Sequence, residues 1–320
     1  FIKVSAGTVH SAALRADGAI LCFGMQADGR CDVPSNLGPF KAVSAGGAHT
    51  AAVRVNGLVV CWGSNVSQQC NVPAALGACR DVSAGAAHTL ALRTDGTVDA
   101  WGSNSSGQRT VPKEAVGCTA IAAGGSHSVA LRVGGSVMAW GSNAAGQCDV
   151  PAGLPQVQAI AAGGSHTVVL RQDGIVVCWG GNGNGQCSAP PGLGGCIAIA
   201  AGTAHSAAVK ANGSLVAWGS DSYGQSSEPA GLGACSGVAA GGGHTVALRA
   251  DGDLECFGAG RFDTGQTPDY GQSRPPADLG SVVRVAGGGF HALGLRADGR
   301  VVGWGSDTSG QASPPARRTT

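Results

Sequence analysis

The sequence is poor in charge, in aromatic residues and in long apolar runs. Charged residues make up 12% of the 320 positions and the net charge is +1, so no basic or acidic field exists to attract nucleic acid or an anionic membrane surface. Glycine interrupts the apolar runs before they reach the length of a membrane-spanning helix. We therefore expect neither nucleic acid as a partner nor direct insertion into a membrane.

The signatures of common catalytic and metal sites are also missing. The chain contains no HExxH, no GxSxG and no CxxC spacing, and no segment has the periodicity of an amphipathic helix. These absences predict a protein that is not an enzyme and that carries no cofactor and no metal.

What the chain does contain is a strict repeat. An aromatic residue follows each histidine by thirteen positions, which accounts for all six tryptophans. A period of this length marks a repeat protein, in which each unit buries its apolar face only against its neighbours. Eight copies fill residues 1–320, so we predict a single domain. Seven of the histidines are spaced by 39 residues and the eighth follows after 47: His10, His49, His88, His127, His166, His205, His244 and His291.

Each copy is predicted to contain a β-hairpin. Asn56-Gly57 in the second copy, and a related Asp-Gly, Asn-Gly or Gly-Gly pair in the others, favour a two-residue turn. Folding the second copy at that turn would pair Ala51 with Trp62. The strands are apolar on both faces, which is typical of sheets that are stacked face to face.

The ends of each copy indicate how the sheets are arranged. Small residues (VSAG, IAAG, VAAG or VAGG) precede every histidine and suit crowded inner strands that converge on a central axis. A proline such as Pro34 or Pro73 closes most copies and suits an outer edge strand. We predict an all-β fold, a closed β-propeller of eight 39-residue repeats; seven blades with a spare copy covered by a partner would also fit.

The consensus AGGxHTxALRxDGxVxxWGxNxxGQ resembles the repeat of the regulator of chromosome condensation family. The resemblance covers the whole chain and implies a ring-shaped propeller that binds other proteins. Members of that family include a nucleotide exchange factor for a nuclear small GTPase, modules of ubiquitin ligases and a plant UV-B photoreceptor. The fifth copy carries the motif in phase as His166, Asp173-Gly174, Trp179-Gly180 and Gly185-Gln186.

Several features of known family members are missing from this sequence, which reduces the number of functions that the resemblance implies. The short period is more similar to that of a bacterial β-lactamase-inhibiting propeller, and such relatives have seven blades. The GWRHT segments of the photoreceptor and the extra hairpin and basic arm of the exchange factor have no counterpart. We expect a noncatalytic propeller that binds another protein as a scaffold or subunit of a larger assembly. Alternatives are a regulatory module (a small-GTPase exchange factor or ubiquitin-ligase substrate receptor) and a secreted inhibitor or binding protein.

The histidines suggest a metal or pH-sensing site, but a simpler role is expected. A metal needs three or four ligands converging within about 2.1 Å, whereas neighbouring blades hold these rings apart. We therefore expect the histidines to form hydrogen bonds between blades. The basic residue before each hairpin, for example Arg54, is expected to pack on the hairpin rather than to form a cationic rim.

The twelve cysteines occupy three positions of the repeat. At two of them cysteine alternates with alanine, glycine, valine or phenylalanine and behaves as a small hydrophobe. Only Cys70 with Cys79, and Cys187 with Cys196, lie together in one connection, so at most these two disulfides are predicted. Oxidised pairs would favour the secreted alternative. The compartment and the oligomeric state stay open, with an intracellular location favoured.

The seventh copy breaks the pattern with eight inserted residues and is the candidate partner-binding site. Tyrosine, phenylalanine and arginine dominate the energetics of protein interfaces, and this chain has only two tyrosines. A loop insertion without function is the alternative, because surface loops accept insertions at low cost. The candidate residues are Arg261, Phe262, Asp263, Asp269, Tyr270 and Arg274 in the insertion, with Tyr223 and Phe290 in the neighbouring copies.

Overall fold

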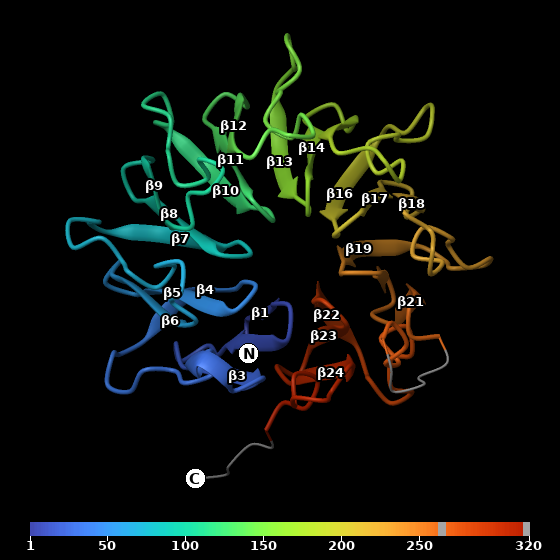
Figure 1. Ribbon diagram of the computed structural model, residues 1–320. Helices are drawn as coiled ribbons and strands as arrows, with labels where there is room; N and C mark the ends of the chain where they lie inside the picture. Colours follow the sequence, from blue (N-terminus) through green and yellow to red (C-terminus); the bar gives the residue numbers. More distant parts are fainter. Residues whose placement is uncertain (262–266, 316–320) are drawn as a thin grey trace.

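The computed structural model describes residues 1–261 and 267–315. Within them the chain forms eight antiparallel sheets of three strands each, arranged around a central opening (Figure 1). Each sheet is one sequence repeat, and we number the sheets as blades 1 to 8 in chain order. A short 3-10 turn at Ala27–Gly29 is the one helical element in the described part of the chain.

Three strands recur in every blade in the order inner, middle, outer. The inner strands are β1 (Lys3–Ala6), β4 (Phe40–Ala45), β7 (Cys79–Ala84), β10 (Cys118–Ala123), β13 (Val157–Ala162), β16 (Cys196–Ala201), β19 (Cys235–Ala240) and β22 (Val282–Gly287). The middle strands are β2 (His10–Leu14), β5 (His49–Arg54), β8 (His88–Arg93), β11 (His127–Arg132), β14 (His166–Arg171), β17 (His205–Lys210), β20 (His244–Arg249) and β23 (His291–Arg296). The outer strands are β3 (Ile20–Gly24), β6 (Val59–Gly63), β9 (Val98–Gly102), β12 (Val137–Gly141), β15 (Val176–Gly180), β18 (Leu215–Gly219), β21 (Leu254–Gly258) and β24 (Val301–Gly305).

The hairpin between the middle and outer strands has a turn of three residues rather than two. In blade 2, the Arg54 amide donates to the Leu58 carbonyl and the Gly57 amide donates to the Arg54 carbonyl, both at 2.8 Å. Gly57 has a φ of +90°, which favours glycine, and the Asn56 side chain accepts a hydrogen bond from the Leu58 amide at 3.1 Å. The Asn-Gly pair thus forms a turn that ends in a left-handed glycine.

This extra residue shifts the strand register by one. Thr50 pairs with Trp62 and Ala51 pairs with Cys61, so the expected pairing of Ala51 with Trp62 is wrong. Because a one-residue shift exchanges the two faces of a strand, Trp62 lies with Thr50 against blade 1, and Cys61 lies with Ala51 against blade 3. The expectation that both faces are buried holds, since each blade packs an apolar face on the next.

Small residues at the ends of the inner strands let eight blades converge. Ala45 and Ala84 line the central opening, as do their counterparts in the other blades. Backbone bonds link neighbouring blades there, for example from the Gly47 amide to the Gly85 carbonyl at 3.0 Å. The predicted crowding of small residues around a central axis is confirmed.

The glutamine of the Gly-Gln motif joins consecutive blades, including blade 2, where Gln68 replaces the glycine. The backbone carbonyl of Gln69 in blade 2 accepts hydrogen bonds from two side chains of blade 3, the Thr89 hydroxyl at 3.0 Å and the Trp101 indole at 2.9 Å. The Gln69 side chain accepts from the Ser67 amide at 2.8 Å and so holds the loop that presents this carbonyl.

The proline-containing segment does not form the predicted outer edge strand. The residues around Pro73 lie outside the three-stranded sheet of blade 2. The Asn65 side chain accepts from the Cys70 amide at 2.9 Å and the Val72 amide donates to the Cys70 carbonyl at 3.0 Å, so this backbone forms turns instead of a ladder. Within the described residues, no helix has the length and apolar character needed to cross a membrane.

Candidate interaction site

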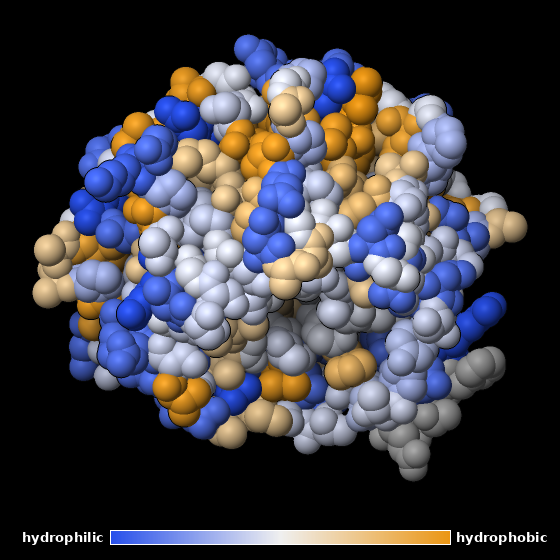
Figure 2. Space-filling model, turned by 45° about the horizontal axis from the view of Figure 1, so that its top comes forward, coloured by the Kyte–Doolittle hydropathy of each residue, from blue (hydrophilic) through white to orange (hydrophobic). Residues whose placement is uncertain are grey.

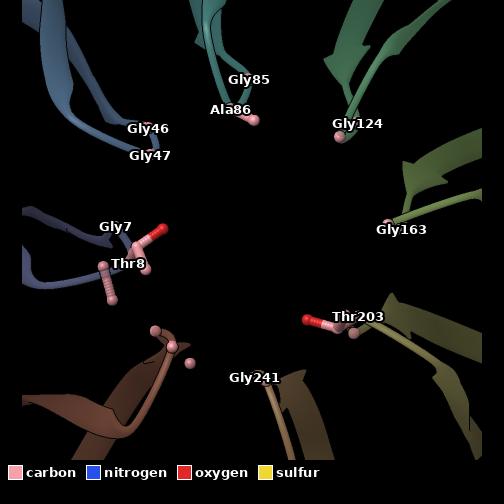
Figure 3. Close-up of a pocket in the computed structure, with 18 of the residues that line it drawn as sticks. Gly7, Thr8, Gly46, Gly47, Gly85, Ala86, Gly124, Gly163, Thr203 and Gly241 are labelled. Atoms are coloured by element: carbon pink, nitrogen blue, oxygen red, sulfur yellow. The ribbon is translucent and has the colours of Figure 1, made fainter.

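The central opening is lined by backbone and very small side chains. Its volume is about 370 Å³, and glycine, alanine and threonine from all eight blades form its wall. The side chains of Thr8 and Thr203 point into it (Figure 3). Phe290 is the one large side chain on the described wall. With so few side chains, the opening itself offers no cluster of catalytic groups.

The eight histidines lie just behind this wall. Each ring packs so closely under a glycine of the wall that a Cβ on Gly124, for example, would come within 2.4 Å of the His127 ring. In seven blades the Nε2 atom bonds to a serine or threonine hydroxyl of the following blade, as between His127 and Thr167 at 3.1 Å and between His291 and Ser11 at 2.8 Å. The predicted hydrogen bonds between blades are confirmed for these seven.

Burial makes these imidazoles neutral. It lowers the pKa of His10 and His244 to about 3 and that of the other six histidines to about 4. Within residues 1–261 and 267–315, no three histidine, cysteine or acidic side chains come together in a way that could hold a metal ion.

The candidate aromatic residues occupy two neighbouring seams. Tyr270 of blade 7 makes an edge-to-face contact with Phe290 of blade 8, with ring centroids 5.8 Å apart. Tyr223 of blade 6 is 50% exposed and lies over Gly243 of blade 7, where an added Cβ would meet its ring at 3.0 Å. Phe290 and Gly242, next to Gly243, both line the opening. We call Tyr223, Tyr270 and Phe290 the aromatic rim.

The insertion is anchored by hydrogen bonds to blade 7. Asp269 accepts from the Gly260 amide at 2.8 Å, and the Tyr270 amide donates to the Gln272 side chain at 2.9 Å. The Tyr270 hydroxyl lies 2.8 Å from the Thr267 hydroxyl. These contacts hold Tyr270 against Phe290. The bond from the Tyr270 amide to the Gln272 side chain is the counterpart of the Ser67–Gln69 bond in blade 2.

The remaining candidates have different positions. Arg261 and Arg274 are exposed and lie at the two ends of the insertion. Phe262 and Asp263 fall outside the described residues. Sequence reasoning missed Gly243 and Thr267, which support the two tyrosines. The signal for Gly243 was available, since it is the only glycine that directly precedes a histidine of the repeat.

The two predicted disulfides are not formed. Cys70 and Cys79 are both free, and the Cys70 thiol lies 3.3 Å from the Ser64 carbonyl beyond one end of β6. The Cys79 amide instead bonds to the Gly57 carbonyl beyond the other end of β6. Five residues of strand span about 17 Å, far more than the Cα separation a disulfide allows.

The second predicted pair is corrected for the same reason. Cys187 and Cys196 are free, with the Cys187 thiol at the Gly181 carbonyl and the Cys196 amide at the Gly174 carbonyl. These contacts lie beyond opposite ends of β15. Closeness along the chain therefore does not bring the two thiols together.

The basic residues before the hairpins are held within their own turns. Arg15 pairs with Asp17 at 2.8 Å and Arg249 pairs with Asp251 at 2.7 Å. In these two blades the basic side chain contacts the aspartate of its own turn, and the packing of its stem on the hairpin stays a prediction. Exposed large apolar residues such as Val66 and Val133 belong to different blades, and Figure 2 shows apolar residues in small separate groups rather than in one broad patch.

The profile of the Regulator of chromosome condensation (RCC1) repeat matches six of the eight blades and more than half of the chain, at residues 40–69, 79–108, 118–147, 157–186, 196–225 and 282–311. No curated protein matches the sequence significantly. The two unmatched blades are the first, which has Arg30 in place of the glutamine, and the seventh, which carries the insertion.

Three solved structures share the fold. The ectodomain of the Physcomitrella patens receptor kinase CR4 is similar with a TM-score of 0.63 and 25% identity, over 80% of this chain and 73% of that one. Human WBSCR16 has a TM-score of 0.61 and 19% identity, over 74% and 83%. Prp20p from Saccharomyces cerevisiae has a TM-score of 0.59 and 21% identity, over 80% and 82%.

Proposed function

Since this chain belongs to the Regulator of chromosome condensation (RCC1) repeat family, we propose that it is a noncatalytic β-propeller that binds another protein through its aromatic rim. In this proposal residues 1–320 are one domain, a closed ring of eight blades that acts as a scaffold or subunit of an assembly. The observation that carries the proposal is the contact of Tyr270 with Phe290 beside the central opening.

Contacts between the first and last blades support closure of the ring. The Ser11 hydroxyl of blade 1 bonds to the His291 ring and to the Gln311 carbonyl of blade 8, each at 2.8 Å. The Gly289 amide donates to the Gly7 carbonyl at 3.2 Å. The same hydroxyl bonds to a histidine ring and to a loop carbonyl join the six seams from blade 1 to blade 7. An eighth blade outside the ring would leave such groups of blades 1 and 8 without partners.

The distribution of aromatic residues supports the rim as the binding surface. Most aromatic side chains occupy the repeated framework positions and are buried there. Tyr223, Tyr270 and Phe290 stand outside those positions and belong to three consecutive blades. Phe290 lines the opening, Tyr270 contacts Phe290, and Tyr223 lies over Gly243, next to the lining residue Gly242. Aromatic residues on a rigid scaffold contribute much of the binding energy at interfaces.

The similar structures support a protein as the partner. The Prp20p structure is described together with its binding properties to Gsp1p and histones, and a second structure holds Kap60 bound to yeast RCC1 (Prp20). Those partners are the yeast protein's own. The use of this fold to bind proteins is what we carry over to the present chain.

The chemistry of the buried groups supports a noncatalytic role. The histidines are neutral at pH 7 because their pKa values lie far below it, and seven of them are committed to bonds between blades. They therefore have no free proton-transfer role in this arrangement.

Affinity capture with matched variants tests the proposal. The intact chain, a Tyr270→Ala/Phe290→Ala variant and a Val55→Ala/Leu58→Ala control are each used as bait in lysate of the source. The control changes two residues that are 58% and 51% exposed at the hairpin of blade 2, away from the rim. A protein that binds the intact chain and the control but not the rim variant, and that repeats this pattern when purified, supports the proposal. Equal binding to all three baits contradicts the rim as the site.

A further inference from the structure

Three blades carry a second cysteine close to the first. One cysteine of each pair lies in the outer strand and the other in the loop that follows, nine residues later. The remaining cysteines at these positions have no such neighbour, because Cys148 follows Ala139, and Cys256 precedes Ser273. The three pairs are Cys22 with Cys31, Cys61 with Cys70, and Cys178 with Cys187.

In blade 2 both cysteines lie near the same peptide group. Cys61 packs against the apolar cluster that contains Trp101. The Trp101 indole and the Thr89 hydroxyl donate to the carbonyl of Gln69, at 2.9 and 3.0 Å. Cys70 is the next residue after Gln69, so the Gln69 carbonyl places the two cysteines at one spot.

Blade 5 repeats this arrangement. Cys178 packs against the apolar cluster that contains Trp218, and the Trp218 indole and the Ser206 hydroxyl donate to the Gln186 carbonyl, at 3.0 and 2.9 Å. Cys187 follows directly. In blade 1 Cys22 packs against the apolar cluster that contains Trp62. Thr50, the strand partner of Trp62, donates at 3.2 Å to the carbonyl of Arg30, the residue before Cys31.

The backbones at the two positions approach closely. Blade 8 has Gly303 and Ala312 there, and a Cβ built on Gly303 would lie 2.8 Å from the Ala312 Cα atom. A disulfide requires Cα atoms about 4.4–6.8 Å apart and Cβ atoms about 3.8 Å apart. The two positions therefore lie side by side in the blade, and the approach in blade 8 is this tight because Gly303 has no side chain.

Electrostatics agree with this proximity. Burial raises the pKa of the Cys22, Cys61 and Cys178 thiols, and the neighbouring loop cysteine raises each of them further. The same burial raises the pKa of Cys70 and Cys187 to about 11. Each loop thiol thus sits close enough to affect its partner in the outer strand.

We propose that these three cysteine pairs are redox-active dithiols, which a small disulfide such as oxidised glutathione converts into disulfides within blades 1, 2 and 5. All twelve cysteines are free in the structure. Each disulfide would fasten the loop that carries the inter-blade carbonyl to its own outer strand. Oxidation therefore stiffens the seams between blades 1 and 2, 2 and 3, and 5 and 6.

The reaction is a pair of thiol exchanges. The loop cysteine, whose thiol pKa is raised less than that of its partner, attacks as its thiolate and releases one glutathione thiolate, leaving a mixed disulfide. The outer-strand thiolate then attacks the loop sulfur and releases the second glutathione. Two protein thiols lose two protons and two electrons, and oxidised glutathione becomes two reduced glutathione molecules. Because both thiol pKa values are raised, the rate increases with pH.

Thiol mapping on the full chain tests the proposal. The folded, reduced protein is incubated with oxidised glutathione, then denatured and alkylated, and its peptides are identified by mass spectrometry. We expect links from Cys22 to Cys31, Cys61 to Cys70 and Cys178 to Cys187. Cys148 and Cys256 serve as internal controls and should not form links within the chain. The midpoint of thermal unfolding should rise on oxidation and return with dithiothreitol.

A single substitution distinguishes disulfide formation within a cysteine pair from nonspecific oxidation of the thiols. Cys61→Ala introduces the residue that three other blades have at this position, Ala100, Ala139 and Ala217, so the fold accommodates it. In this variant Cys70 should stop at the mixed disulfide while the other two pairs still close. Full alkylation of all twelve cysteines, mixed disulfides that never close in the intact chain, or links from Cys70 to Cys79 would each overturn the proposal.

Discussion

The ring of His244 faces Ala292 across the seam between blades 7 and 8. The remaining seven repeated histidines each meet a hydroxyl of the next blade. Among residues 1–261 and 267–315, neither nitrogen of His244 has a hydrogen-bond partner, although the residue is fully buried. A buried polar group without a partner costs about 1–3 kcal/mol. The seam that adjoins the insertion is therefore held less firmly than the others.

Restoring the hydroxyl should strengthen this seam. We expect Ala292→Ser to raise the free energy of unfolding by about 1 kcal/mol, because it supplies the missing partner for His244. Denaturant unfolding at constant m-value measures the change. The matched control is Thr167→Ala, which removes the 3.1 Å bond to His127 and should lower stability by about 1–3 kcal/mol. If Ala292→Ser leaves stability unchanged, His244 is satisfied in another way.

The buried histidines should make the protein sensitive to acid. Burial lowers their pKa from 6.5 to about 3–4 in the folded chain, so the unfolded chain binds more protons between these values. Their contribution to stability is complete above pH 6.5 and is lost as the pH falls toward 4. Each histidine adds about 1.4 kcal/mol per pH unit to the slope inside this window.

Urea unfolding from pH 8 to pH 4 checks this prediction. Stability should be nearly flat above pH 7 and fall increasingly steeply below 6.5. His244→Gln should remove the contribution of one histidine, about 1.4 kcal/mol per pH unit, from the slope of unfolding free energy against pH. A profile that stays flat down to pH 5 would mean that the histidines are not buried as the structure has them.

Much of the architecture could be predicted because its signals are local and recur. The histidine and tryptophan spacing marks the blades, and small residues mark the centre. The hairpin register was missed because an Asn-Gly pair suits both a two-residue turn and a three-residue turn with a left-handed glycine. A disulfide between Cys70 and Cys79 was predicted because the two residues are close in sequence. In the structure they lie beyond opposite ends of strand β6, and the cysteine near Cys70 is Cys61, which belongs to that strand.

The candidate site was predictable only in part. Its residues belong to neighbouring copies, so a propeller places Tyr270 and Phe290 near each other once the copies are recognised as blades. The support of Tyr223 by Gly243 depends on a contact between residues twenty positions apart in adjacent blades. No pattern within one repeat reveals such a contact.

Glycines behind the central wall should be sensitive to any side chain. A Cβ on Gly124 would lie 2.4 Å from the His127 ring and 2.7 Å from the Gly163 carbonyl oxygen, so we expect Gly124→Ala to destabilise the fold by about 2 kcal/mol. Gly194→Ala is the control, because a Cβ there meets nothing within 4 Å. Thermal unfolding of the two variants distinguishes them. Equal midpoints would mean that the wall yields to the added methyl group.

The position of Tyr223 should depend on the absence of a side chain at Gly243. A Cβ there would meet the Tyr223 ring at 3.0 Å and Ala259 at 3.7 Å, so Gly243→Ala should displace the ring from the rim. Because other blades carry alanine at this position, as at Ala48 and Ala204, stability should change little. We expect the affinity for the rim partner to fall about tenfold, the size of a moderate interface contribution. Calorimetric titration with the purified partner measures this loss, with Ala48→Gly as a control at the same position in blade 2. A loss of affinity in both variants would point to a change of the whole ring, and no loss in either would exclude Tyr223 from the interface.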